Sequence, residues 1–100
     1  RAIQIAEALP RSPAGYAAAA QLARCGTSVG ANIEEADGAE TKPDKRRSMI
    51  ISRKEAREAR FWLRIIDRHW PRAAGVSGDI AEASELISIL SAMIRKIGTP

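Results

Sequence analysis

Arginines recur at helical spacing in the middle of the chain. Four of them follow one another at intervals of 4, 3 and 4 residues: Arg53, Arg57, Arg60 and Arg64. This spacing places side chains on one side of a helix, and Arg46 and Arg68 fall close to the same side. A row of guanidinium groups can meet successive phosphates of a nucleic acid. The candidate nucleic-acid-binding residues are therefore Arg46, Arg53, Arg57, Arg60 and Arg64.

The charge of the chain is concentrated around this row. The net charge is +4, yet residues 42–72 hold eleven basic and four acidic residues, and the remainder is acidic overall. Such a segment indicates an anionic partner. It is equally compatible with pairing inside the chain, between Arg64 and Asp67 or with the preceding acids Glu34, Glu35, Asp37 and Glu40. We see no platform of exposed aromatics for single strands and no helix-turn-helix or zinc-finger spacing.

The sequence gives little support for catalysis, metal binding or a disulfide. Cys25 is the single cysteine and His69 the single histidine, so we predict no disulfide, no zinc site and no di-iron site with paired Glu-x-x-His motifs. Cys25 has no adjacent base, and no phosphate-binding loop is visible. We expect no catalytic residue, no cofactor, no bound metal and no enzymatic activity. A lone cysteine, the lack of a long apolar run and the lack of a signal peptide favour a cytoplasmic protein that does not enter a membrane.

Apolar periodicity predicts helices throughout. In the clearest one, between Pro43 and Pro71, apolar and small residues repeat at 3-4 spacing: Met49, Ser52, Ala56, Ala59, Leu63, Ile66 and Trp70. A seam of this kind predicts packing at about 20° to a neighbouring helix. Thr41 or Lys42 precedes Pro43 as the start of this helix.

Three further helices surround this one. The helix from Ser12 to about Gly38 is expected to continue through Gly26 and Gly30, because its apolar spacing does not change phase there. The last helix begins at a capping box with Asp79 as cap and ends at Gly98. The first spans residues 1–9 and stops at Pro10.

The predicted fold is all-α, an antiparallel up-down-up-down four-helix bundle in a single domain of residues 1–100. Its first helix is much shorter than the others, and we expect it to be truncated at the N-terminus. So small a bundle is marginally stable alone, which favours oligomers. Off the seam of the third helix, Phe61 is expected in the core. Trp62 and Ile65 are candidates for either a subunit interface or the core.

Two segments carry a resemblance to a known family. TSVGANIEEA at residues 27–36 and KEAREARFWLR at residues 54–64 occur in order and register. Together they resemble the four-helix-bundle proteins named for 23S rRNA intervening sequences, over residues 16–97. The resemblance implies homopentamers of antiparallel bundles with a basic surface, without enzymatic activity. Some members are encoded in inserts of rRNA genes, and others assist a reverse transcriptase. It also implies that Asn32 and Glu35 occupy shared structural positions.

The sequence leaves two functions open. The first is an oligomer, a homopentamer by resemblance, whose basic face binds RNA or another nucleic acid. The second is a protein-interaction scaffold, such as an accessory subunit of a nucleic-acid enzyme, whose arginines pair only with acids.

Overall fold

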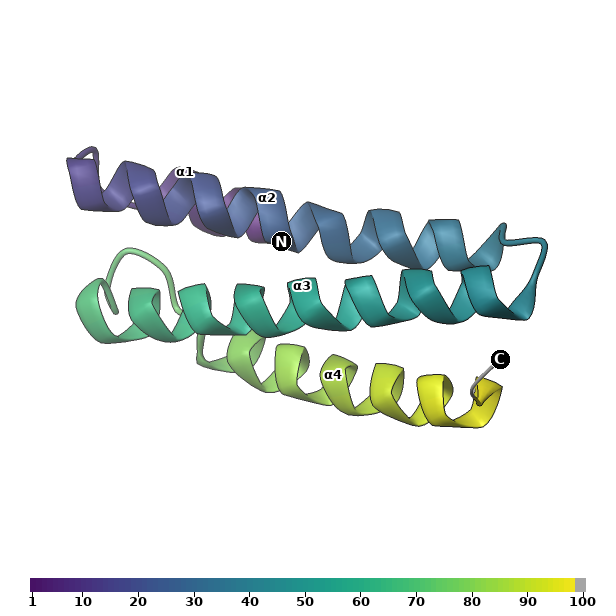
Figure 1. Cartoon of the computed structure of the whole chain (residues 1–100). Helices are drawn as coiled ribbons and strands as arrows, with labels where there is room; N and C mark the ends of the chain where they lie inside the picture. Colours follow the sequence, from purple (N-terminus) through teal and green to yellow (C-terminus); the bar gives the residue numbers. More distant parts are fainter. Residues whose placement is uncertain (99–100) are drawn as a thin grey trace.

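A computed structural model describes residues 1–98 of the chain, and all regular structure in that part is helical. The elements are α1 (Ala2–Ala8), α2 (Pro13–Asp37), α3 (Lys42–His69) and α4 (Ser77–Ile97). Helix α3 packs against α2 and α4, and α1 packs against α2. The chain reverses direction between α2 and α3 and again between α3 and α4 (Figure 1). The predicted all-helical bundle is confirmed, and truncation of the seven-residue α1 stays a prediction.

The seam predicted for α3 forms the centre of the core. All of its residues except Trp70, which is half-buried, are the buried residues of this helix: Met49, Ser52, Ala56, Ala59, Leu63 and Ile66. The seam extends along the bundle, whose longest dimension is 45 Å. Near α1 it meets large side chains such as Ile5 and Leu22, and further along it meets Val29 and Ile87.

Helix α2 runs unbroken through its glycines, as predicted. At Gly26 the reason is close packing, because a Cβ built there would lie 2.6 Å from the Cβ of Ala2 in α1. Opposite this stretch, Ser52 is completely buried and donates a hydrogen bond to the Val29 carbonyl at 2.9 Å. This bond supplies the buried hydroxyl with the partner that it needs.

Helix boundaries follow the predicted signals at two starts, and the helices end next to the predicted stops at Pro10, Gly38, Pro71 and Gly98. Ser12 and Thr41 accept hydrogen bonds from backbone N–H groups three residues on, and Gly98 ends α4 with φ 78°. The capping box at Asp79 was predicted wrongly. Helix α4 already begins at Ser77, and the Asp79 carboxylate instead pairs with Arg1 at 3.2 Å.

Two glycines of α2 should respond oppositely to alanine. At Gly30 an added Cβ meets open space, so Gly30→Ala should stabilise by about 0.5–1 kcal/mol through helix propensity. At Gly15 the Cβ would lie 1.9 Å from the Pro10 carbonyl oxygen, so Gly15→Ala should cost about 1–3 kcal/mol. Urea unfolding at one protein concentration measures both. Equal shifts of the two midpoints would contradict these contacts.

Candidate nucleic-acid interface

The structure divides the five predicted arginines into two groups. Arg46, Arg53 and Arg60 are half-buried on the flank of α3 that meets α4. Arg53 donates to the Ser91 hydroxyl at 3.3 Å, and Arg60 donates to the Ser84 hydroxyl at 3.2 Å. These two arginines are therefore held against α4.

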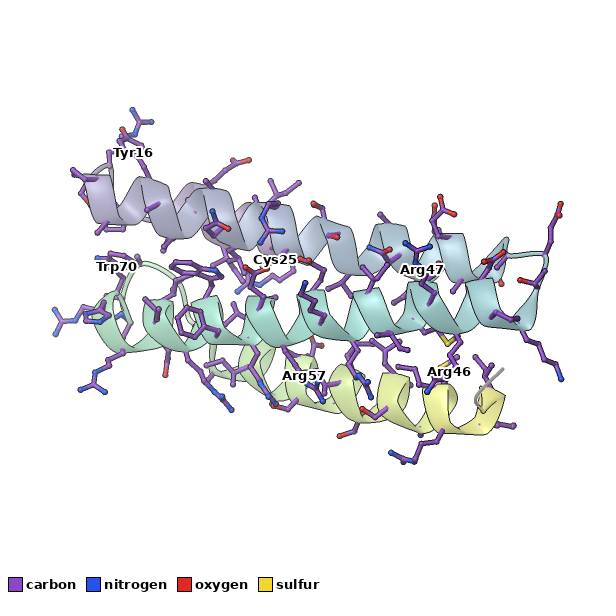
Figure 2. The ribbon with its side chains drawn as sticks, in the orientation of Figure 1. Tyr16, Cys25, Arg46, Arg47, Arg57 and Trp70 are labelled. Atoms are coloured by element: carbon purple, nitrogen blue, oxygen red, sulfur yellow. The ribbon has the colours of Figure 1, made fainter. Side chains whose placement is uncertain are left out.

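Arg46 lies at the start of α3, with Arg57 near the middle of the helix and Trp70 beyond its end (Figure 2). The Nε of Arg46 is buried and has no hydrogen-bond partner within residues 1–98. A buried donor without an acceptor is unfavourable. The Nε of Arg46 therefore lacks a hydrogen-bond partner in the described part of the chain, whereas the guanidinium groups of Arg53 and Arg60 each donate to a serine of α4.

Arg57 and Arg64 project into solvent with other cations of the same helix. Exposed side chains follow one line along α3, at intervals of 7, 3, 4, 3 and 4 residues: Arg47, Lys54, Arg57, Phe61, Arg64 and Arg68. We call this line the outer stripe. It spans roughly 32 Å at 1.5 Å per residue. Four residues of this line were not among the predicted site residues, although their helical spacing from Arg57 and Arg64 already placed them on it: Arg47, Lys54, Phe61 and Arg68.

None of the salt bridges within residues 1–98 involves a residue of the outer stripe. In the part of the chain that the structure describes, Arg24 pairs with Glu55 and Glu58, and Arg1 pairs with Asp79. The hydrogen bond with Glu58 raises the pKa of Arg24. The two α3 glutamates thus neutralise a cation of α2. The alternative left open by the sequence, in which the arginine row pairs with the α2 acids or Arg64 pairs with Asp67, is not found among the ion pairs of residues 1–98.

Trp62 and Ile65 lie together on the side of α3 that meets α2. Both are half-buried, and Trp62 packs against the large core cluster. They line a groove of about 420 Å³ with Ala14, Ala17, Ala18, His69 and Trp70. A groove with this apolar lining suits a side chain from another protein molecule. Their role as a subunit interface stays a prediction.

The motif residues of α2 make a local contact. The Asn32 side-chain amide donates to the Ser28 carbonyl at 2.9 Å and to its hydroxyl at 3.2 Å. Glu35 is exposed and lines a surface hollow with Arg47 and Asp44. Within residues 1–98, no three His, Cys, Asp or Glu side chains gather closely enough to hold a metal ion.

Cys25 is fully buried between α2 and α3, and its thiol donates weakly to the Leu22 carbonyl. Burial raises the pKa of the thiol, and the negative charge of Glu58 raises it further. Because the thiolate is the reactive form, the native protein should react with a disulfide reagent at pH 8 far more slowly than the urea-unfolded chain. Stoichiometric labelling of the native protein within seconds would contradict this packing.

These features define a small helical bundle whose third helix exposes several arginine side chains and one lysine to solvent. Residues 1–95 match the family of the 23S rRNA-intervening sequence protein, and the chain belongs to this family. It is similar to a crystal structure of a protein with unknown function from the S23 ribosomal protein family of Bacteroides thetaiotaomicron. The two are 28% identical, with a TM-score of 0.82 over 94% of this chain and 88% of the other. No curated protein matches the sequence. Within residues 1–98, no helix has the length and apolar character needed to span a bilayer.

Proposed function

We propose that this protein is a non-enzymatic, oligomeric helical bundle that binds RNA or another nucleic acid through the outer stripe of α3. One observation carries the proposal. The cations of this stripe are exposed, and the ion pairs of residues 1–98 involve other basic residues.

The chemistry of the stripe matches a phosphate backbone. Solvated arginines and lysines release counterions from a nucleic acid when they meet its phosphates, and this release supplies most non-specific affinity. A helix of 28 residues presents those charges on a rigid line. Guanidinium groups also form bidentate hydrogen bonds with phosphate oxygens.

Assembly into a homopentamer in the cytoplasm is the second part of the proposal. The groove lined by Trp62 and Ile65 provides a surface for contact between subunits. A ring would present several stripes together, so that one nucleic acid could engage more than one of them. Light scattering should give about five times the subunit mass of 10.8 kDa. A monomer mass that does not change with concentration would contradict the assembly.

Nucleic-acid binding is tested with a fluorescein-labelled RNA of about 20 nucleotides and the unmodified protein. Anisotropy titrations at several KCl concentrations between about 50 and 200 mM should show a steep loss of affinity as salt rises. Absence of binding at about 50 mM KCl would overturn the proposal.

The rival function is a scaffold for another protein, and the same groove is the observation that favours it. A scaffold would assemble in a manner insensitive to salt and would have no measurable affinity for RNA. The two experiments above therefore separate the two functions.

A further inference from the structure

Phe61 lies in the middle of the outer stripe and is not a core residue. Its side chain is 54% exposed, which corrects the expectation from the sequence. The buried seam occupies the opposite side of α3. A large aromatic surface left in water is unfavourable unless something covers it.

The position of the ring is fixed by its neighbour. The rings of Phe61 and Trp62 meet edge to face, with centroids 5.3 Å apart and planes at 80°. Trp62 is itself packed against the core. The contact supports Phe61 from one side, in a favourable aromatic geometry, while more than half of its surface remains accessible.

Cations flank the ring on the same helix face. Arg57 precedes Phe61 by four residues and Arg64 follows it by three, and both are exposed. Residues at these spacings have Cβ atoms about 5–6 Å apart. An exposed aromatic between two guanidinium groups combines a stacking surface with two phosphate contacts, which is the composition of single-strand binding sites.

We propose that Phe61 is a base-stacking platform and that the outer stripe selects single-stranded over duplex nucleic acid. The inference rests on the proposed function. Inside a duplex both faces of each base are covered by neighbouring bases, so away from the duplex ends only an unpaired base can stack on the ring. Arg57 and Arg64 then hold the backbone on either side of that base.

The test compares Phe61→Leu, Phe61→Ala and Phe61→Trp with the unmodified protein. The probes are a fluorescein-labelled single-stranded oligouridine of 12 nucleotides and a labelled RNA duplex of 12 base pairs. Phe61→Leu and Phe61→Ala should weaken single-strand binding by roughly 5- to 100-fold. Their salt dependence and their duplex affinity should be unchanged, and Phe61→Trp should retain binding. Ile89→Ala, which removes a side chain on α4 that is 50% exposed, is the matched control. It should leave the affinity for both RNA probes unchanged.

Several results would overturn the inference. One is single-strand binding by Phe61→Leu equal to that of the unmodified protein, and another is an equal loss for the duplex. A changed oligomer mass in Phe61→Leu would assign the ring to a subunit contact instead. If the unmodified protein binds RNA and Phe61→Leu binds equally well, only the stacking inference fails. If the unmodified protein binds neither probe, the proposed function fails with it.

Discussion

The double variant Arg57→Glu with Arg64→Glu is expected to bind RNA about 10- to 100-fold more weakly at about 0.1 M salt. Each phosphate contact contributes about 0.7 to the slope of log affinity against log salt for a single strand, so removing two should flatten the slope by about 1.4. Both side chains are exposed, so their replacement leaves the core intact. Anisotropy titrations over a range of KCl concentrations measure the affinity and the slope together.

A control of equal charge separates this effect from net charge. Arg11→Glu with Arg95→Glu also changes two exposed arginines, which lie outside α3. This variant should retain most of the affinity and the original slope. If both double variants lose the same affinity, the binding depends on total charge and the outer stripe has no special role.

The largest expected loss of stability comes from the C-terminal end of the seam, where it meets the large core cluster. Ile66 is fully buried beside Leu63 and Val76, and Ile66→Ala would leave a cavity that the surrounding helices fill only in part. The expected cost is about 2–5 kcal/mol. In a chain of this size such a loss lowers the Tm by about 10 °C or more. Thermal unfolding followed by circular dichroism measures it, at one protein concentration because assembly also contributes to stability.

The comparison for this variant is Ile89→Ala, the exposed-site replacement on α4. Its effect should stay within about 0.5–1 kcal/mol, because most of the removed surface is already in contact with water. If Ile66→Ala and Ile89→Ala lower the Tm equally, the assignment of Ile66 to the core would be wrong.

The seam of α3 was predictable because its spacing is itself the packing geometry. A residue every three or four positions meets the neighbouring helices, and every predicted residue from Met49 to Ile66 is buried. The starts at Ser12 and Thr41 were predictable for a similar reason, since a cap is a local contact over three residues. Asp79 had the same local pattern, but its carboxylate pairs with Arg1 instead of capping the helix. Arg1 lies 78 positions away in the chain, and a local pattern does not indicate such a contact.

The division of the arginine row could not be predicted from the sequence. At 3.6 residues per turn, Arg53 and Arg57 differ by roughly 40° around the helix. Whether such an offset separates a half-buried from an exposed side chain depends on where α4 packs. Helix α4 packs beside Arg53 and Arg60, where Ser91 and Ser84 accept their hydrogen bonds. Phe61 was misplaced because its residue type favours the core, while its position in the heptad pattern put it on the outer face.

Photo-crosslinking identifies directly which part of the protein contacts bound RNA. The unmodified protein is irradiated with a single-stranded RNA containing 4-thiouridine at about 0.1 M salt, digested with trypsin and analysed by mass spectrometry. The outer stripe predicts that RNA is attached to the peptide of residues 61–64, which contains Phe61. Tyr16 on α2 is 60% exposed and serves as an internal control of comparable accessibility. RNA attached to the peptide of residues 12–24 and absent from residues 61–64 would contradict binding by the outer stripe.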